Sequence, residues 1–341
     1  LASSGLCVSL YLWNNKYTHD GIQPSQGQLS VTEANLEKTS FLIRDWEFYP
    51  DQLLTPDTYP GDHMIYTAIG DRTRFDGLGT RTSPHGCGSY ALHIDLPKAT
   101  LAYALELPEI YSAYKLYING KLITSVGNPQ PDSYTPATQA KIVTFEAGGH
   151  VDILLAVSDY SHFYSGMVYP PVFGTFPKVE SLHNIRLAVT LIACTIGLLF
   201  SLLYFYFGLS MKQRAPLIFA ALCLLMFITP LFPIIHTIWE LSIFPWYALE
   251  LICIYLMMFL VIRLHNRLCD TGYYCRRIST AISAVFCLVA GCYGFFSAHL
   301  TVPVMQLFSQ CLFVYKLAFA AYLLISTAAS IKRLNNTSRP L

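Results

Sequence analysis

Five long apolar runs in the second half of the chain constrain its fold more than any other feature. They cover residues 185–209, 215–235, 244–262, 278–298 and 302–331. Each run has about 19 residues or more, which at 1.5 Å per residue can cross the roughly 30 Å hydrocarbon core of a bilayer. The runs lack the alternation of a barrel strand, so they predict five transmembrane helices. Pro230 and Pro233 predict a kink or an end in the second helix.

The ionisable residues divide the chain into two halves of opposite charge. Residues 1–184 hold 11 basic and 18 acidic residues, a net charge of −7, whereas residues 185–341 hold 11 basic and 3 acidic residues, a net charge of +8. The basic residues of the second half form short clusters between apolar runs rather than one basic face, so nucleic acid is not an expected partner. The pattern predicts an acidic soluble module joined to a membrane module in contact with lipid.

Outside the apolar runs, the basic residues of the predicted helical region are confined to alternate loops. The segments after the first, third and fifth runs contain Lys212, Arg214, Arg263, Arg267, Arg276, Arg277, Lys332, Arg333 and Arg339, whereas the loops HTIWELSI and SAHLT contain no Lys or Arg. The positive-inside rule then predicts that the basic segments are cytoplasmic. The residues before the first run, including the acidic half, are predicted to lie outside the cytoplasm.

Apart from Arg186 at the very start of the first run, two ionisable side chains fall within the predicted membrane helices. Glu250 lies near the outer end of the third run and Lys316 near the middle of the fifth. An intramembrane charge is by default a candidate functional residue. Alternatively, Glu250 reaches the interface and the Lys316 ammonium extends towards it or bonds a carbonyl. A Glu250–Lys316 pair is a further alternative, although counting from the span starts places Lys316 about 12 Å deeper.

The first half of the chain shows the two-residue period of half-buried strands. In SYALHIDLP, Tyr90, Leu92, Ile94 and Leu96 share one face, opposite Ser89, Ala91, His93 and Asp95. The segments LAYALEL and VDILLAVS alternate in the same way, with Leu101, Tyr103, Leu105, Leu107, Val151, Ile153, Leu155 and Val157 predicted to point inward. Several short strands separated by turn signals predict an all-β sandwich or jelly roll.

Asn119-Gly120 stands between two apolar runs of this first half. Because both residues tolerate positive φ, the pair predicts a tight type I′ hairpin. Residues 14–40 are polar and are predicted to lead into the first strand, whereas VFGTFPKVESLHN should join the last strand to the first membrane helix without a flexible tether.

The distribution of the ten cysteines does not predict a disulfide framework. Only Cys7 and Cys87 lie in the first half, and a bridge between them is left open, while the other eight lie in or beside apolar runs. No C-x-x-C or H-E-x-x-H spacing occurs, so we predict no metal site and no cofactor. The apolar segment Leu1–Trp13 is interpreted as the remnant of a signal peptide or N-terminal anchor.

Several segments, in this order, resemble the bacterial seven-transmembrane receptors with diverse intracellular signalling modules. They are WEFYPDQLL from Trp46, GCGSYALHIDLP, SAYKLYINGKLITSVG, VSDYSHFYSGMVYPPVFG and IGLLFSLLYFYFGLSMKQRAPLIFAALCLL. The resemblance covers residues 28–334. It implies a periplasmic jelly-roll domain similar to carbohydrate-binding and galactose-binding-like modules, anchored in the bacterial inner membrane. It also implies seven helices and a cytoplasmic output module, commonly a histidine kinase or a diguanylate cyclase.

This sequence departs from that family pattern in showing five spans and no kinase or cyclase motif. The start at Leu1 rather than Met and the end soon after the fifth run suggest a fragment, from which the sixth and seventh spans and an output module in cis would be absent. Whether two further spans follow Leu341 is left open. The expected organisation is a leader or anchor remnant and lead-in at 1–27, a β-sandwich domain at 28–180 and a helical membrane domain at 181–341. A homodimer is compatible with the sequence, which does not fix the oligomeric state.

The candidate ligand contacts are polar and aromatic residues of the first half. The segment Ser158–Gly166 leaves a strand in a predicted loop and contributes Asp159, His162 and Tyr164. Tyr117 is a surface candidate because it lies opposite the apolar face of its strand, whereas Tyr90 and Tyr114 are expected in the core. The second choice is the segment HGCG (85–88) together with Arg72, Arg74 and Arg81 of one loop. These three arginines could bind a carboxylate or an acidic sugar, or else form a solvated face.

The sequence favours a receptor that binds a small molecule or carbohydrate outside and passes the signal through the helices. An alternative is a transporter or channel with an outer capture domain, which Glu250, Lys316, Gln306 and Gln310 would serve, although no internal repeat supports it. An anchored extracellular enzyme is a third class. No nucleophile elbow or other catalytic set is present, so we predict that this chain is not an enzyme.

Overall fold

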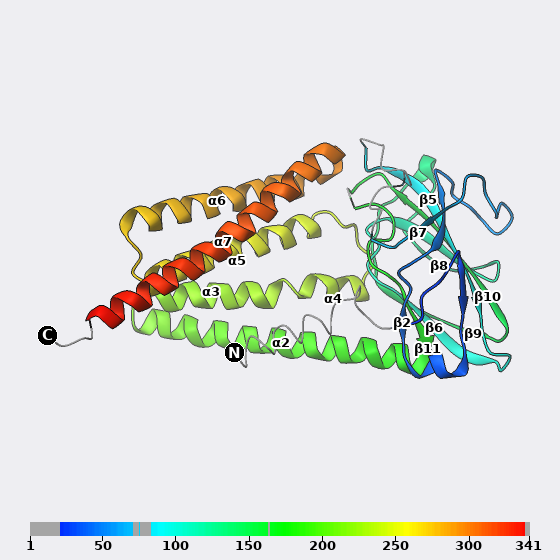
Figure 1. Cartoon of the computed structure of the whole chain (residues 1–341), viewed down its shortest axis with the longest axis horizontal. Coiled ribbons are helices and arrows are strands. Elements are labelled where there is room, and N and C mark those ends of the chain that lie inside the picture. Colours follow the sequence, from blue (N-terminus) through cyan, green and yellow to red (C-terminus); the bar gives the residue numbers. More distant parts are fainter. Residues whose placement is uncertain (1–20, 71–74, 76–82, 163, 338–341) are drawn as a thin grey trace. The chain divides into compact units, whose positions relative to one another are not determined.

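A computed structural model describes residues 21–70, 75, 83–162 and 164–337. The chain divides into two compact units. The first comprises Leu1–Leu187 and Ile235–Ile243, and the second comprises Ala188–Ile234 and Phe244–Leu341. Figure 1 labels the helices and strands of both units.

The larger sheet of the first unit has seven strands among the described residues, six of them in the order β4-β3-β5-β10-β7-β8. The seventh strand, β1, pairs in parallel with β5, and the other pairings are antiparallel. The strands are β1 (Gln28–Ser30), β3 (Trp46–Pro50), β4 (Ile65–Thr67), β5 (Gly86–Asp95), β7 (Ala113–Ile118), β8 (Lys121–Val126) and β10 (His150–Asp159). The polar lead-in expected at 14–40 thus already contributes a strand, β1.

The smaller sheet has four strands among the described residues, in the order β2-β11-β6-β9. These are β2 (Ser40–Phe41), β6 (Leu101–Leu107), β9 (Lys141–Ala147) and β11 (Val172–Thr175), all paired antiparallel. Two short 3₁₀ helices, η1 (Glu33–Glu37) and η2 (Pro131–Ser133), lie in the connections.

One hydrophobic core joins the two sheets, as expected of a sandwich. It contains Leu92 and Ile94 of β5 together with Tyr103 and Leu105 of β6. The predicted inward residues of β10 are all buried. One expectation was wrong: Leu101, at the first position of β6, is 39% exposed, because the strand begins there at the margin of the sheet.

The Asn119-Gly120 turn forms as predicted. Asn119 has φ of 48° and Gly120 has φ of 75°, and the two residues connect β7 to β8. Asn119 also holds the neighbouring strand, since its Oδ1 accepts a hydrogen bond of 2.8 Å from the Asp152 amide. Its side chain is therefore part of the framework of the turn.

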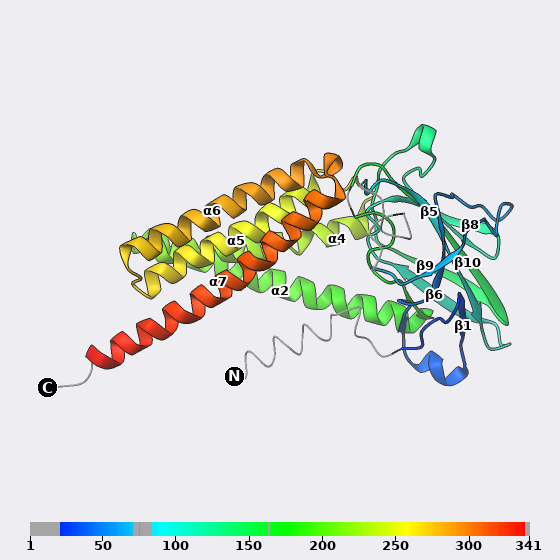
Figure 2. The same ribbon diagram turned by 45° about the horizontal axis from the view of Figure 1, so that its top comes forward.

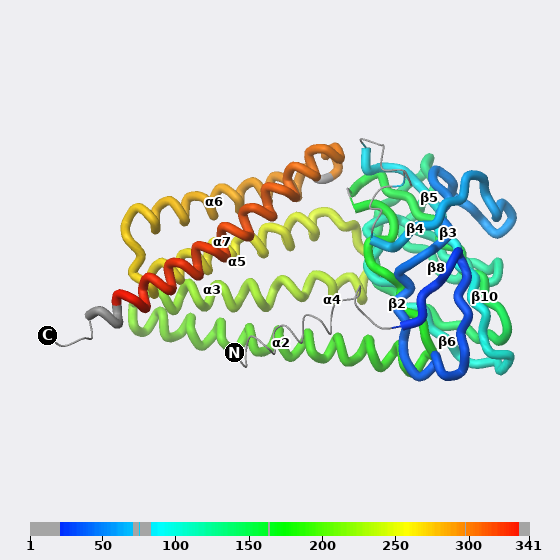
Figure 3. The backbone as a smooth tube through the Cα atoms, in the orientation of Figure 1, coloured from blue at the N-terminus to red at the C-terminus, as the bar shows by residue number. Residues whose placement is uncertain are grey.

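Among the described residues, five helical segments are long and apolar enough to cross a membrane, which indicates a membrane protein. The helices are α2 (Phe176–Ser210), α3 (Arg214–Ile228), α4 (Leu231–Ile238), α5 (Trp246–Leu268), α6 (Tyr273–Phe295) and α7 (Val302–Thr337), with η3 (Ser297–His299) before α7. α3 and α4 together form the second span, Arg214–Ile238, and the break between them lies at Pro230, as predicted. Figure 3 follows the backbone through them.

The first helix begins earlier than its apolar run. The sequence predicts a span from residue 185, but α2 starts at Phe176, directly after β11 ends at Thr175 (Figure 1). Pro177 fits this start because proline is tolerated in the first turn, where its missing amide has no helical partner. Residues 176–187 of α2 belong to the first unit and pack on the smaller sheet, where Val179 is fully buried with Phe41 and Ala104.

In the second unit, α5 and α6 lie side by side (Figure 2). Tyr255, Ala290 and Tyr315 form a buried cluster that also joins α7. The ring of Phe286 stacks on that of Tyr315 with centroids 4.1 Å apart.

Candidate ligand-binding site

A pocket of about 190 Å³ opens on the face of the larger sheet that points away from the shared core. Its lining comes from β5, β7 and β10 and from the loop after β3: Pro56, Tyr59, Ala91, His93, Tyr117, Gly120, Asp152, Ile153 and Leu154. The two-residue period explains this composition, since residues between the core positions of each strand must face outward. The volume is below the 300–1,000 Å³ typical of drug-sized ligands, so the pocket suits a small molecule.

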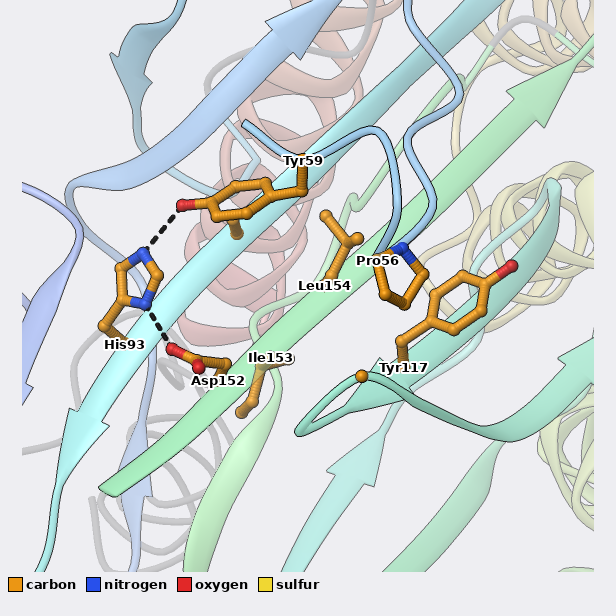
Figure 4. Close-up of a pocket in the computed structure, with 9 residues that line it drawn as sticks. Pro56, Tyr59, His93, Tyr117, Asp152, Ile153 and Leu154 are labelled. Carbon is orange, nitrogen blue, oxygen red and sulfur yellow. Dashed lines mark hydrogen bonds and ion pairs between the residues drawn. The ribbon is translucent and has the colours of Figure 1, made fainter. Parts of the chain in front are cut away.

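A hydrogen-bonded chain of polar side chains crosses one wall of this pocket. The Tyr59 hydroxyl donates to Glu47 Oε2 at 2.9 Å and lies 2.8 Å from His93 Nε2. His93 Nδ1 lies 2.5 Å from Asp152 Oδ1. Figure 4 shows Tyr59, His93 and Asp152 in this order, with Pro56 and Tyr117 on the other side of the pocket. Tyr49 also donates to Glu47 Oε2, at 2.9 Å.

His150 extends this chain along the sheet. Its Nδ1 lies 2.9 Å from Asp95 Oδ1 and its Nε2 lies 2.9 Å from Asp152 Oδ1. The rings of His93 and His150 stack with centroids 6.1 Å apart. Asp152 is therefore the common partner of two imidazoles.

The surroundings shift the pKa values of four of these groups. Burial, with the hydrogen bond to Glu47, raises the pKa of Tyr49 to about 12 and raises the pKa of Tyr59 even further. Burial alone would raise the pKa of Asp152, but the hydrogen bonds from His93 and His150 outweigh it and lower the pKa. The hydrogen bond with Asp95 raises the pKa of His150, against the effect of burial. At neutral pH the wall thus presents protonated phenols beside a carboxylate.

Among the predicted contact residues that the structure describes, Tyr117 alone lines this pocket. It lies on β7, directly opposite Leu154 of β10, and its ring is half-buried. As expected, Tyr90 and Tyr114 are buried in the core. The phenol ring of Tyr117 and the apolar side chain of Leu154 give the pocket an apolar side opposite its polar wall (Figure 4).

Three candidate contact residues lie at the end of β10 and in the loop that follows it, and two of the three are buried. Asp159 and His162 are 0% and 1% exposed, and Tyr164 is half-buried. Asp159 Oδ1 accepts hydrogen bonds from the amides of Ser161 and His162, both at 2.9 Å, and from the Tyr134 hydroxyl at 3.2 Å. The carboxylate therefore shapes the start of the loop that we expected, which follows β10 and contains no helix or strand among its described residues before β11. A ligand-binding role of the three residues stays a prediction.

The remaining candidates lie elsewhere. Arg72, Arg74 and Arg81 lie outside the described residues, as does Cys7, the partner considered for Cys87. Gly86, Cys87 and Gly88 form the start of β5. In the second unit Glu250 is half-buried and Lys316 is exposed.

Sequence reasoning missed Tyr59, His93 and Asp152 as pocket residues. The alternation of β5 had already placed His93 on the outward face, and the alternation of β10 does the same for Asp152. The missing information was the pairing of these two strands, because His93 and Asp152 stand 59 positions apart in the chain.

No family model and no curated protein matches this chain. Parts of solved structures are similar to it. One is a GH2 β-galacturonidase from Eisenbergiella tayi bound to galacturonate, at 16% identity over 40% of this chain and 24% of that chain, with a TM-score of 0.28. Another is the β-glucuronidase of Faecalibacterium prausnitzii, at 15% identity over 41% of this chain and 31% of that chain, with a TM-score of 0.32. The β-glucuronidase of Ruminococcus gnavus is similar at 14% identity over 40% of this chain and 28% of that chain, with a TM-score of 0.28. The match spans less than a third of each of these enzymes, and TM-scores of this size say nothing about the activity of this chain.

Proposed function

We propose that this chain is the sensing and membrane part of a bacterial receptor. Its β domain, with a jelly-roll topology, lies in the periplasm and binds a small carbohydrate or a similarly polar small molecule in the pocket between Tyr59 and Tyr117. The helices stand in the inner membrane and pass the bound state to a cytoplasmic histidine kinase or diguanylate cyclase in cis.

The pocket has the chemistry that a polyhydroxylated ligand needs. Sugar rings present apolar faces that pack on aromatic side chains, and hydroxyls that bond charged groups. Tyr117 supplies a half-buried ring, and the Tyr59–His93–Asp152 wall supplies oriented donors and acceptors. Asp152 Oδ1 already contacts two imidazoles, so its second carboxylate oxygen, Oδ2, is the atom suited to accept a hydrogen bond from a ligand hydroxyl.

The observation that carries the proposal is the direct continuation of β11 into α2. Thr175 ends the strand and Phe176 begins the helix, so no flexible residue can absorb a movement of the sheet. The first turns of α2 are also fixed to the smaller sheet by the burial of Val179 and by the His183 Nδ1 to Glu106 Oε1 contact of 3.0 Å. A rearrangement of the β domain must therefore turn or shift the start of this helix.

The β domain also contacts the segment between the second and third membrane spans. Segment Ile235–Ile243, which comprises the end of α4 and the connection that follows it towards α5, belongs to the first unit. Thr138 and Leu241 exchange backbone hydrogen bonds of 2.7 and 3.3 Å, and the Gly127 amide donates to Glu240 Oε1 at 2.6 Å. His236 Nδ1 lies 2.5 Å from Glu109 Oε1. Ligand binding that favours one arrangement of the domain would bias both connections together.

The test has a binding arm and a relay arm, both on the full chain in lipid nanodiscs. Neutral and acidic monosaccharides are titrated by calorimetry into the parent protein, Tyr117→Ala and Tyr160→Ala. Tyr160 is the matched control, because it is an exposed tyrosine that does not line the pocket. We expect a sugar that binds the parent and Tyr160→Ala, and binds Tyr117→Ala at least 10-fold more weakly, since aromatic anchors commonly contribute about 2 kcal/mol. Equal affinity in all three would exclude this pocket.

The relay arm inserts Gly-Ser-Gly-Ser between Thr175 and Phe176. Hydrogen exchange of α2 and of the α5–α6 connection is compared with and without the bound sugar. We expect the sugar to change exchange in the parent and not in the insertion variant, while its affinity stays the same. An unaltered response of the helices after insertion would contradict signalling through this junction.

A further inference from the structure

Four side chains of β5 and β10 form a rectangle on the outward face of the larger sheet. His93 of β5 is directly opposite Asp152 of β10, and Asp95 of β5 is directly opposite His150 of β10. Each imidazole thus faces a carboxylate across the strands, and each strand carries one of each at positions two apart. Residues two apart share a face, so all four groups meet above the sheet.

Three of these groups place metal-ligand atoms together. One ligand atom each from His93, His150 and Asp152 lies within 4.8 Å of the other two. A Zn²⁺ ion with bonds of 2.0–2.2 Å needs tetrahedral ligand atoms about 3.3 Å apart. The distances from Asp152 Oδ1, 2.5 Å to His93 Nδ1 and 2.9 Å to His150 Nε2, are shorter than this. Small side-chain rotations would therefore open the triangle to the size that the ion needs.

The outer contacts of both imidazoles are those that orient metal-binding histidines. A ligating histidine usually directs its second nitrogen to a carboxylate or another polar group, which fixes the ring. His150 Nδ1 contacts Asp95, and His93 Nε2 contacts the Tyr59 hydroxyl, which itself donates to Glu47. Each ring therefore presents its other nitrogen, Nε2 of His150 and Nδ1 of His93, to Asp152.

We propose that His93 Nδ1, His150 Nε2 and Asp152 Oδ1 bind a divalent transition-metal ion, with Zn²⁺ as the preferred ion. Two imidazoles and one carboxylate are a borderline donor set that suits Zn²⁺, Cu²⁺ or Ni²⁺ and not Ca²⁺ or Mg²⁺, which take oxygen ligands. Three protein ligands leave a coordination position for water or for a ligand oxygen. His93 and Asp152 line the pocket, so that position adjoins it.

This site does not depend on the receptor proposal, because metal binding has its own readout. The rival account is that two protonated imidazoles and two carboxylates form ion pairs that need no metal. The two accounts differ in what Zn²⁺ does, since only a metal site binds it stoichiometrically and releases protons on binding.

The experiment is a calorimetric titration of ZnCl₂ into the full chain in nanodiscs, after removal of any affinity tag. Variants are His150→Gln, Asp152→Asn and Asp95→Asn. His183→Gln is the matched control, because His183 also pairs with a carboxylate, but with Glu106 of the other sheet. His150 is 52% exposed at its side chain, so its substitution should leave the fold intact, which hydrogen exchange of β5 and β10 verifies.

We expect one Zn²⁺ per chain in the parent and in His183→Gln. We expect at least a 100-fold loss of affinity in His150→Gln and Asp152→Asn, and a loss of about 10- to 100-fold in Asp95→Asn, which removes only an outer contact. Co²⁺ should give visible absorption bands that the two ligand variants lack. Absence of saturable binding at micromolar Zn²⁺ would overturn the proposal, as would stoichiometric binding that His150→Gln and Asp152→Asn leave unchanged. Either of these two negative results would leave the sugar-binding proposal standing, because the titrations of Tyr117→Ala and Tyr160→Ala test that proposal separately.

Discussion

The amide of His162 donates a hydrogen bond of 2.9 Å to the carboxylate of Asp159, and both side chains are buried. Burial raises the pKa of Asp159 to about 7, although the amides of Ser161 and His162 oppose the shift. Burial lowers the pKa of His162 to about 3. Tyr134 and His85 also face this pair, and burial raises the pKa of Tyr134, so its hydroxyl keeps its proton.

These two shifts have opposite effects on stability. The folded state favours protonated Asp159, so this stabilisation is complete below about pH 4 and is lost as the pH rises towards 7. The folded state favours neutral His162, so that stabilisation is complete above about pH 6.5 and is lost as the pH falls towards 3. Between about pH 4 and 6.5 the two contributions have equal and opposite slopes.

We therefore predict that Asp159 and His162 together make almost no net contribution to the pH dependence of the parent domain's stability in that window. In Asp159→Asn only the histidine contribution is left, so the free energy of unfolding should rise by about 1.4 kcal/mol per pH unit. In His162→Gln it should fall at a similar rate. Hydrogen exchange of the β10 amides, corrected for the intrinsic rate at each pH, measures the three slopes. Identical slopes in the three proteins would contradict these shifts.

Tyr114 and Tyr117 stand three positions apart on β7 and should respond differently to truncation. Tyr114 is 0% exposed in the core, whereas Tyr117 lines the pocket and is half-buried. Tyr114→Ala should destabilise the domain by about 3–5 kcal/mol, the usual cost of emptying a large core site. Tyr117→Ala should cost about 1 kcal/mol, because solvent fills the space. Thermal unfolding of the two variants measures the difference, and equal losses would place Tyr117 in the core.

The elements that the sequence predicts well are those with a local cause. The alternation in SYALHIDLP places Leu92 and Ile94 in the core, and the Asn119-Gly120 pair produces its turn through positive φ. Long apolar runs likewise predict the five membrane-spanning helices. The start of α2 at Phe176 was missed because the first turns of that helix contact the smaller sheet and are not continuously apolar.

The pocket could not be predicted in the same way because its cause is not local. Nothing in the sequence indicates that β5 pairs with β10, so His93 and Asp152 could not be joined. At the polar segment that leaves β10, the sequence suggested a ligand contact that the pocket does not include. The polarity of this segment suggested exposure, but Asp159 and His162 are buried and Asp159 bonds within the protein, and polarity alone does not distinguish the two situations.

The packing of α5 on α6 depends on the lack of a side chain at Gly294. A Cβ added there would lie 2.8 Å from the Ala248 Cα, which is backbone and cannot rotate away. Gly294→Ala should therefore separate the helices and lower stability by about 1–3 kcal/mol. Gly291→Ala is the control, since its Cβ would meet Ile252 Cγ1 at an ordinary 3.4 Å and alanine favours a helix. Thermal inactivation in nanodiscs should separate the two variants; equal stability would show that the α5–α6 contact yields easily.

Asn266 joins three helices through its side chain. Its Oδ1 accepts a hydrogen bond of 2.6 Å from the Tyr322 hydroxyl of α7, and its Nδ2 donates to Ser279 Oγ of α6 at 3.0 Å. Asn266 itself lies on α5 and is 2% exposed. Because a buried amide without partners is costly, this contact should hold the ends of the three helices in one arrangement.

A double-mutant cycle of Asn266→Ala and Tyr322→Phe tests this junction. We expect each single variant to lose about 1 kcal/mol and the pair to show a coupling energy of about 0.6–1.7 kcal/mol, the range found for hydrogen bonds between membrane helices. Tyr315→Phe serves as the matched control, because the Tyr315 hydroxyl donates to Ser283 and not to Asn266. Its loss should add to that of Asn266→Ala. Additive losses for Asn266 and Tyr322 would mean that this hydrogen bond contributes nothing to joining α5 and α7, which would then be held by their other contacts, such as His265 Nε2 to Ser326 Oγ at 2.6 Å.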